Sequence, residues 1–364
     1  MILTHKMEIK PNKTIIKLFE KYFGYSRYCY NKGLSIWEEE YSKGNKPNGR
    51  KVRDIFKSIK QEWEKEYSPV VLDTAIEDLE KAYNMFYKKI NKKPKFKSKK
   101  INKNSFRVYR KCDSTIRIKH NKLYLPRFPY GIKLTENIRF NGTIKTCTIT
   151  KKANRYFASF SIELKNETEI KNKFPTTNKV AGIDLGLKTF AVLADDKYFY
   201  KYFYPSKLKA YYAKINYLNR KLSKKQKGSN KFNVMKTKLQ RTYLRIFNIQ
   251  MDFLQKLTTN IIKNYDKIVI EDLNVNGMLK NKKLSSKIYR SLFYCFKVLL
   301  EYKRKIYEKQ LIIVDKFFPS TQKCSKCGNI KTKEDKLTLA DRTYKCDCGN
   351  IIDRDENAAK NLYL

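Results

Sequence analysis

Three carboxylates that lie far apart in the sequence each stand at one end of a predicted element. Asp184 ends the apolar run that begins at Lys179 (KVAGIDLG), which favours a buried strand because glycine is costly inside helices. Glu271 lies at the end of a β-branched run (KIVIEDL), a second predicted strand. Asp355 lies where a helix would begin in DRDENAAKNL, the segment that starts at Asp353. One acid after an apolar run is more often a solvated turn residue, so only the recurrence at three positions points to chemistry.

Three such acids are what a nuclease that uses two metal ions requires. Two Mg²⁺ ions about 4 Å apart share acidic ligands, so that one ion activates the attacking water and the other stabilises the leaving oxygen. We therefore expect Asp184, Glu271 and Asp355 to meet at one sheet edge as catalytic residues and magnesium ligands. The sequence leaves open whether Asp353 assists Asp355.

Four of the eight cysteines cluster near the C-terminus in two pairs, each followed by glycine. The pairs are Cys324 with Cys327 and Cys346 with Cys348, with 18 residues between them. This separation predicts a zinc ribbon, in which four sulfurs hold two turns that lack a core of their own. The second pair departs from the pattern, with one intervening residue instead of two. Because the two histidines, His5 and His120, are remote in sequence, we expect a structural zinc and exclude nucleases that need histidine ligands.

The chain of 364 residues carries 81 Lys and Arg against 35 Asp and Glu, a formal net charge of +46. A surplus this large predicts a polyanion partner, because neutralised phosphates release their counterions. An AT-rich genome would explain the preference for lysine but not the small number of acids. No apolar stretch approaches the roughly 20 residues that span a bilayer, and the first residues lack a signal-peptide pattern. We expect a soluble, intracellular protein of two or three domains.

A first basic stretch without acids runs from Asn91 to Lys111 and holds ten Lys or Arg. Phe96, Phe106 and Tyr109 are interleaved with the cations, which favours contact with a nucleic-acid backbone combined with stacking on bases. The alternative is a solvated charged face.

A second basic stretch without acids runs from Pro205 to Arg245 and holds thirteen Lys or Arg. Leu208, Ile215, Leu218 and Leu222 recur at helical spacing, so one face of a long helix should pack. The other face either lies along a duplex backbone or is merely solvated. Over both stretches the candidate nucleic-acid contacts are Lys95, Lys97, Lys99, Arg107, Lys221, Lys224 and Lys225.

The N-terminal half predicts one strand, then helices, then short strands. A strand at Met1–Lys10 comes first. Helices follow at Leu18–Tyr41, Val52–Tyr67 and Val70–Ile90, and we assign most of their aromatic residues to a core. The short strands lie at Ser114–Lys119, Lys122–Leu125, Thr143–Lys151 and Tyr156–Leu164, the last two joined as a hairpin around Ala153 and Asn154. These strands could close a small barrel. The polar segment Lys165–Asn178 is the expected domain boundary.

The C-terminal half predicts three strands followed by alternating helices and strands. The strands lie at Lys179–Asp184, Phe190–Ala194, Tyr198–Tyr204, Ile268–Ile270 and Leu311–Lys316. One long helix precedes the fourth strand, and a helix at Ser286–Lys309 precedes the fifth. This order is the layout of an RNase H-like sheet.

With these residues in view, the chain resembles the TnpB family, RNA-guided DNA endonucleases that bacterial insertion sequences encode and that are related to type V CRISPR effectors. The resemblance is carried by GIDLG from Gly182, IEDLNVNGML from Ile270, LEYKRK from Leu300, FFPSTQKCSKCG from Phe317 and CGNIIDRDENAAKNL from Cys348. It is close across Lys179–Leu362 and looser before it, where PKFKSKKINKNSFRVY from Pro94 matches best. Gln250 and Gln255 stand where the family often has Arg and His.

The resemblance implies an α+β multidomain fold. It divides the chain into a β-barrel wedge domain (1–10 and 105–170), a helical recognition insertion (11–104), an RNase H-like α/β nuclease domain of the RuvC type (179–320 and 350–364) and an inserted zinc ribbon (321–349). It makes Asp184, Glu271 and Asp355 the RuvC-type catalytic acids.

The implied function is an RNA-guided DNA endonuclease of an insertion sequence. Two Mg²⁺ ions would be catalytic and one Zn²⁺ structural, and the partners would be a guide RNA from the transposon end and double-stranded DNA bearing a short flanking motif. The alternatives are a guide-bound repressor that does not cut and an acid-triad transposase. We expect a bacterial cytoplasmic protein associated with the nucleoid, and the oligomeric state stays open.

Overall fold

The computed structural model describes residues 1–364 except 101–102, 113–114, 333–334 and 339. The chain divides into two compact units, Met1–Glu167 and Thr168–Leu364, and each is described here by itself. The division falls inside the polar segment 165–178, where a domain boundary is expected. No helix of the described residues is long and apolar enough to cross a membrane.

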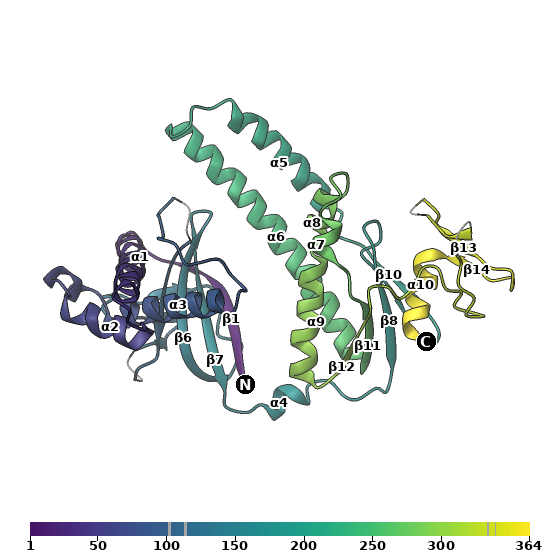
Figure 1. The fold of residues 1–364 in the computed structure, drawn as a ribbon, viewed down its shortest axis with the longest axis horizontal. Helices are drawn as coiled ribbons and strands as arrows, with labels where there is room; N and C mark the ends of the chain where they lie inside the picture. The colour runs from purple at the N-terminus through teal and green to yellow at the C-terminus, as the bar shows by residue number, and fades with distance from the viewer. Residues whose placement is uncertain (101–102, 113–114, 333–334, 339) are drawn as a thin grey trace. The chain divides into compact units, whose positions relative to one another are not determined.

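Unit 1 is built on an antiparallel sheet of seven strands in the order β2-β6-β7-β1-β5-β4-β3, which curls into a half-barrel (Figure 1). Its long central strands pair along most of their length, and the β6–β7 hairpin turns at Ala153 and Asn154, both with positive φ, as a tight two-residue hairpin turn requires. The strands are β1 (Ile2–Lys10), β2 (Asn104–Tyr109), β3 (Arg117–Lys119), β4 (Lys122–Tyr124), β5 (Ile132–Leu134), β6 (Gly142–Lys152) and β7 (Arg155–Leu164). The start of the strand predicted from residue 114 lies outside the described residues.

The helices of unit 1 share one hydrophobic core with this sheet. They are α1 (Lys13–Ser42), α2 (Gly49–Ser58) and α3 (Pro69–Tyr87), with a short 3-10 helix at Glu62–Glu66. The continuous helix predicted at Val52–Tyr67 is therefore wrong, because α2 ends before this 3-10 turn. The assignment of the aromatic residues to a core is confirmed: Phe19 is fully buried, and Trp37 stacks on Tyr83 with ring centroids 4.4 Å apart.

Strand β2 was missed in the basic stretch 91–111, and its side chains alternate between the core and the surface. Phe106 is 1% exposed and packs against Phe19, so it cannot stack on bases. Tyr109 donates a hydrogen bond to Asp73. Phe96, which is 59% exposed, stays available for stacking. A two-residue alternation masked by many lysines is hard to recognise as a strand.

Unit 2 is built on a mixed sheet of five strands in the order β10-β9-β8-β11-β12 (Figure 1). β8, β9 and β10 form an antiparallel meander, whereas β11 runs parallel to both β8 and β12. The strands are β8 (Val180–Leu185), β9 (Ala191–Ala194), β10 (Phe199–Tyr202), β11 (Lys267–Glu271) and β12 (Gln310–Val314). All five strands predicted for this half of the chain are present, in the predicted order along the sequence.

The two faces of this sheet are covered by different helices. Ala181 and Ile183 of β8 point to the face that α6 (Asn230–Asn264) and α9 (Phe293–Tyr307) cover. Gly182, between them, faces α10 (Arg354–Tyr363): a Cβ at this position would lie 2.3 Å from the carbonyl oxygen of Ala359. Because side chains alternate along a strand, Asp184 shares the α10 face with Gly182.

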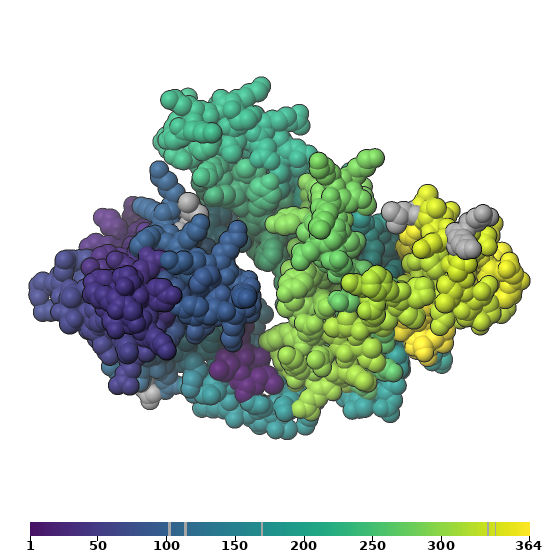
Figure 2. Space-filling model, in the orientation of Figure 1, coloured from purple at the N-terminus to yellow at the C-terminus, as the bar shows by residue number. Residues whose placement is uncertain are grey.

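The one long helix predicted after β10 is wrong, because the structure has a hairpin of two helices, α5 (Leu208–Ser223) and α6. The turn between them contains Gly228 at φ +90°, and Ser229 caps α6 by accepting a hydrogen bond from the Phe232 amide. The predicted apolar face of α5 packs on α6. The hairpin projects beyond the sheet of its unit (Figures 1 and 2).

The helix predicted at Ser286–Lys309 is also interrupted. Leu292 adopts the left-handed conformation, with φ of 56°, and separates α8 (Ser285–Ser291) from α9. Several short elements were not predicted. They are β5, the helices α4 (Thr168–Lys171) and α7 (Val275–Met278), and the strands β13 (Thr343–Lys345) and β14 (Ile351–Asp353), which pair in the cysteine-bearing segment. Helix α4 opens unit 2.

Candidate active site and metal centre

Two of the three predicted acids lie on neighbouring parallel strands. Ile183 of β8 pairs with Ile270 of β11, so the next residues, Asp184 and Glu271, follow side by side at the carboxyl ends of these strands. Both acids alternate with apolar residues that face α6 and α9, so both carboxylates lie on the α10 side of the sheet.

Helix α10 brings the third acid to the same place. Asp355 lies in the first turn of α10, and α10 packs directly on β8 at Gly182. Just beyond β8, a Cβ on Gly186 would lie 4.0 Å from Oδ2 of Asp355. The three carboxylates, separated by more than eighty residues at each step of the sequence, therefore approach one another at one end of β8.

The pKa of Asp184 reflects the proximity of the other two acids. Its side chain is 8% exposed, and burial raises its pKa to about 8, helped by the negative charges of Glu271 and Asp355 and opposed by Arg354. Burial also raises the pKa of Glu271, against a hydrogen bond from Ser320. Such repulsion between acids at the end of a sheet is typical of a functional site and costs folding energy.

Basic residues neutralise part of this negative charge. The Arg354 guanidinium donates two hydrogen bonds to Oδ1 of Asp355, at 3.0 and 3.2 Å. Lys201 reaches the far side of the α10 N-terminus, where its Nζ lies 2.9 Å from Glu356 and 3.6 Å from Asp353. One oxygen of Asp355, Oδ2, is left without these contacts.

Asp353 has a structural task at the same helix end. Its Oδ1 accepts hydrogen bonds from the backbone amides of Asp355 and Glu356, at 2.9 and 3.2 Å, and so caps α10. Its other oxygen pairs with Lys201. The cap holds the first turn of α10 in place and thereby positions Asp355.

Sequence reasoning did not single out three buried polar residues beside the acids. Ser320 donates a hydrogen bond to Oε1 of Glu271. Asn357 and Asn361, on one face of α10, bind backbone carbonyls of the segment that leads into the cysteines. The signal was available, because Ser320 lies in FFPSTQKCSKCG and both asparagines lie in DRDENAAKNL, two of the segments that carry the resemblance.

The four cysteines form a cluster whose sulfur atoms all lie within 4.8 Å of one another. The Cys324–Cys348 and Cys327–Cys346 sulfur distances are 3.7 and 3.6 Å. Zinc–sulfur bonds of about 2.3 Å place tetrahedral sulfurs roughly 3.8 Å apart, so the single-residue spacing of the second pair does not prevent closure. Gly328 and Gly349 turn the chain after each pair with φ near +80°. Among the described residues no other group brings three or more metal-binding side chains so close together, and the three acids are more widely spaced.

The protonation of Cys324 also suits a metal. This cysteine is buried, which opposes ionisation, but hydrogen bonds from the backbone amide of Cys327, the Asn350 side chain and the backbone amide of Lys326 outweigh burial and lower the pKa of the thiol to about 6. Thiolate is the form that binds zinc. With four sulfur ligands and no open position, the cluster is of the structural type.

A cavity of about 720 Å³ opens beside Glu271 in unit 2. Its wall includes Lys297 and Lys316, and Lys297 pairs with Asp272 at 2.6 Å. The cavity offers space for a substrate next to one of the acids, with cations on its wall.

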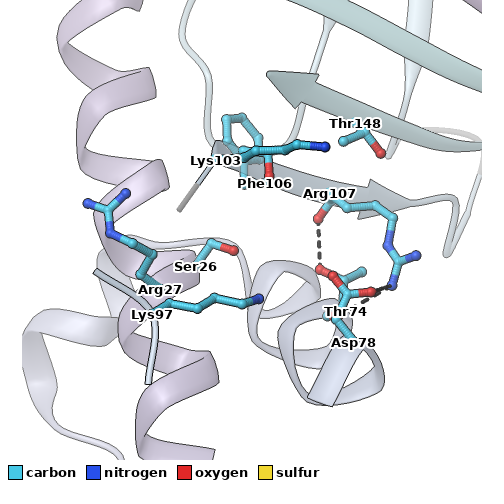
Figure 3. A pocket seen from close by; sticks show the side chains of 10 residues that line it. Ser26, Arg27, Thr74, Asp78, Lys97, Lys103, Phe106, Arg107 and Thr148 are labelled. Carbon is cyan, nitrogen blue, oxygen red and sulfur yellow. Dashed lines mark hydrogen bonds and ion pairs between the residues drawn. The ribbon is translucent and has the colours of Figure 1, made fainter. Parts of the chain in front are cut away.

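A second cavity, of about 570 Å³, lies in unit 1 and contains two of the predicted nucleic-acid contacts (Figure 3). The amino groups of Lys97 and Lys103 extend into this space (Figure 3). The Lys97 ammonium lies 3.4 Å from the centre of the Tyr30 ring. Arg107 is engaged within the protein: its guanidinium pairs with Asp78 at 2.7 Å and with Glu77 at 3.2 Å.

The other predicted nucleic-acid contacts are exposed lysines. Lys95 and Lys99 flank Lys97 in a segment outside the helices and strands. Lys221 lies in the last turn of α5, over the Tyr217 ring at 4.6 Å, and Lys224 and Lys225 begin the turn to α6.

Comparison with known proteins agrees with this architecture. Residues 159–282 match the OrfB family of IS605, described as "Probable transposase", and residues 293–362 match the "Cas12f1-like, TNB domain". Residues 1–46 match a family described as "Helix-turn-helix domain". In this structure the same residues form the strand β1 and one continuous helix, α1, rather than two helices joined by a turn.

Relatives match along nearly the whole chain. A "Putative RNA-guided DNA endonuclease" of Streptomyces pristinaespiralis is 31% identical over 356 residues, 93% of this chain and 83% of the relative. "Putative RNA-guided DNA endonuclease InsQ" of Escherichia coli K12 is 27% identical and covers 98% of this chain and 90% of the relative.

The fold is that of a solved CRISPR effector. The Cas12f1 chain in a cryo-EM structure of the Cas12f1-sgRNA-target DNA complex superposes with a TM-score of 0.61 at 13% identity, over 97% of this chain and 83% of the other. A half-barrel sheet, a mixed sheet with acids at the ends of its strands and a four-cysteine ribbon thus define a Cas12f-like fold. Within it, the chain belongs to the TnpB family, the OrfB proteins of IS605.

Proposed function

We propose that this protein is an RNA-guided DNA endonuclease in which Asp184, Glu271 and Asp355 hold divalent cations, of which Mg²⁺ is the expected one. The observation that carries the proposal is the position of Asp184, buried against two further acids. Nothing in the packing of β8 requires an acid there, because Val192, its partner on β9, is apolar. An acid kept at such a cost is explained by a task that needs its charge.

The donor set fits a hard cation. Carboxylate oxygens are the ligands that Mg²⁺ prefers, and a cation among them would relieve the repulsion that raises the pKa of Asp184. Three carboxylates gathered at one end of β8 could be shared as ligands by two ions about 4 Å apart. When bound, such ions would stabilise charge on the scissile phosphate and activate the attacking water.

The chain itself supplies rigid placement of these ligands. Asp184 and Glu271 stand on central strands, and Asp355 stands on a helix whose first turn Asp353 caps. Arg354 balances the charge of Asp355. The cavity beside Glu271 would receive the DNA strand, with Lys297 and Lys316 near its phosphates.

We assign the four cysteines a structural Zn²⁺, since four sulfurs at tetrahedral spacing leave no open position. We also propose the finer division into a wedge (1–10 and 105–170), a recognition insertion (11–104), a nuclease domain (179–320 and 350–364) and a ribbon (321–349). The substrate would be DNA at the bacterial nucleoid.

The nucleic-acid partners would be a guide RNA and double-stranded DNA; the Cas12f1 complex named above contains an sgRNA and target DNA. The net charge of +46 favours such partners. Lys95, Lys97 and Lys99 are candidate phosphate contacts in unit 1, and exposed lysines of the α5–α6 hairpin, Lys221, Lys224 and Lys225, are candidates in unit 2. Arg107 would first have to leave its two acidic partners, so we rank it last.

The test is to express the full chain together with the DNA that flanks its gene, sequence the RNA that co-purifies, and incubate the complex with a matching DNA target and Mg²⁺. The expected result is one discrete RNA that ends in variable sequence and cleavage of matched DNA only. Asp184→Ala should retain the RNA and lose cleavage.

Two other outcomes would refute the proposal. Tight binding of matched DNA without any cut would identify a guide-bound repressor. Joining of DNA ends without RNA would identify a transposase, the activity that the description of the OrfB family names.

A further inference from the structure

The hydroxyl of Ser320, in the segment that leads into the cysteines, contacts the carboxylate of Glu271. Ser320 lies between β12 and the first cysteine pair, is 3% exposed, and donates its hydroxyl proton to Oε1 of Glu271. Glu271 is the last residue of β11, where the backbone ladder ends, and its carboxylate is held by this contact. Among the described residues no other side-chain donor to this carboxylate is recorded within hydrogen-bond distance.

Ser320 is itself fixed by helix α10. Its carbonyl oxygen accepts a hydrogen bond of 2.7 Å from Nδ2 of Asn361, which also donates to the carbonyl oxygen of Lys323 at 2.7 Å. Asn357, one turn earlier, donates to the same Lys323 oxygen and accepts from the Ser325 amide. Both asparagines are buried, so these bonds are shielded from water.

The same helix carries Asp355 in its first turn. A continuous set of hydrogen bonds thus runs from α10 through Asn361 to Ser320 and from Ser320 to Glu271. α10 also packs on β8 beside Asp184. The same helix therefore helps to position all three acids relative to one another.

We propose that Ser320 is a positioning residue for Glu271. Its hydroxyl holds Oε1 and turns Oε2 toward the other two acids. This inference rests on the proposed function, because it assigns Ser320 to the cation site formed by those acids. Groups that orient metal ligands in this way typically affect metal affinity or activity by about 10- to 100-fold.

A purely structural serine would behave differently. If Ser320 served only to fill space in the segment before the cysteines, its hydroxyl could be removed without any specific effect on divalent-cation binding. Ser291 is a matched control, because it is 2% exposed and its hydroxyl donates to the Ile288 carbonyl of its own helix rather than to a carboxylate.

The experiment compares Ser320→Ala, Ser320→Thr and Ser291→Ala in the full chain, purified with its RNA and zinc. Mn²⁺ affinity is measured by electron paramagnetic resonance of free Mn²⁺, and single-turnover cleavage is measured against Mg²⁺ concentration. We expect Ser320→Ala to bind Mn²⁺ about 10- to 100-fold more weakly and to need correspondingly more Mg²⁺. Zinc content and binding of matched DNA should not change, Ser320→Thr should recover most of the loss, and Ser291→Ala should resemble the wild type.

The double variant Ser320→Ala/Glu271→Gln isolates the coupling. Once Glu271 has lost its charge, removal of the hydroxyl should cost no further Mn²⁺ affinity, because the two residues act as one unit. Wild-type Mn²⁺ affinity in Ser320→Ala, an equal loss in Ser320→Thr, or full additivity in the double variant would overturn the inference.

These results separate the inference from the proposed function. If Glu271→Gln alone cleaves and binds Mn²⁺ as the wild type does, the assignment of the acids fails. If Glu271→Gln is inactive while Ser320→Ala is unaffected, only the role of Ser320 fails.

Discussion

Substituting Asp184 by Asn should stabilise the protein while it abolishes its activity. Asn has the shape of protonated Asp but cannot ionise. In the folded chain, burial and two neighbouring acids raise the pKa of Asp184 to about 8, whereas in the unfolded chain the carboxyl ionises near 3.8. Between these pH values the unfolded chain has released a proton that the folded chain retains, so wild-type stability falls as pH rises.

The magnitude follows from the same two pKa values. Between pH 3.8 and the folded pKa, each pH unit costs the folded wild type about 1.4 kcal/mol, which amounts to about 4 kcal/mol at pH 7 and about 5 kcal/mol at pH 8. In Asp184→Asn this cost is absent. For a unit of roughly 200 residues, 1 kcal/mol shifts Tm by about 2–4 °C, so the variant should melt about 10 °C higher at pH 7.

The assay is calorimetric unfolding of the full chain between pH 5 and 8 in Mg²⁺-free buffer without chelator, so that zinc is retained. Asp195→Asn is the matched control, because Asp195 is equally buried, at 8% exposed. Burial opposes its ionisation, but hydrogen bonds from the Tyr198 and Lys197 amides and the Tyr265 hydroxyl prevail and lower its pKa. That substitution should destabilise the protein by a similar amount across this whole pH range, because Asp195 is ionised in both the folded and the unfolded chain above pH 5.

Added Mg²⁺ should raise the Tm of the wild type but not that of Asp184→Asn, because only the wild type presents the full set of carboxylates. An Asp184→Asn protein that is less stable than the wild type at pH 7, or whose advantage does not grow with pH, would refute the reasoning about a strained acid cluster.

Three further predictions concern the elements around the site. Gly182→Ala should lower the free energy of unfolding by about 3 kcal/mol, since its Cβ would lie 2.3 Å from the backbone of α10, and hydrogen exchange should locate the loss of protection in α10. Stripping zinc with a chelator, or Cys327→Ser, should unfold the segment 321–349 and release Asn357 and Asn361 from their carbonyl partners, seen as a lower Tm together with lost cleavage. Burial lowers the pKa of Lys303 from 10.5 to about 8. Between these pH values the unfolded chain binds a proton that the folded chain does not, so the stability of the wild type should rise with pH. Lys303→Met should abolish that rise, as measured by denaturation at a series of pH values.

The convergence of the three acids at one edge of the sheet could be predicted, because the sequence shows where the strands that carry Asp184 and Glu271 end. The runs before Asp184 and Glu271 are short, apolar and rich in small or β-branched residues, and parallel strands bring their carboxyl ends to one edge. The cysteine cluster could also be predicted from the sequence, because two pairs of closely spaced cysteines at this separation are typical of zinc ribbons.

Other features depend on tertiary contacts that local patterns do not contain. Whether the basic stretch after Pro205 is one helix or two depends on Gly228 and on the packing of α5 against α6, while its leucine spacing is the same in both cases. Phe106 looked free among lysines because the partner strand β6 and helix α1 that bury it are remote in sequence. Ser320 acquires its role only when the fold carries it to Glu271, and serine has no pattern that signals such a contact.

The proposal that Asp184, Glu271 and Asp355 act together as ligands is tested most directly by comparing two acids that lie two residues apart. Asp353→Asn keeps a good helix cap, whereas Asp355→Asn removes a ligand. In single-turnover cleavage of matched DNA by the RNA-loaded protein, Asp355→Asn should be at least roughly a thousandfold slower than the wild type, about 4 kcal/mol, with Asp353→Asn within a few-fold. Robust cleavage by Asp355→Asn, or an equal loss in both variants, would contradict the account.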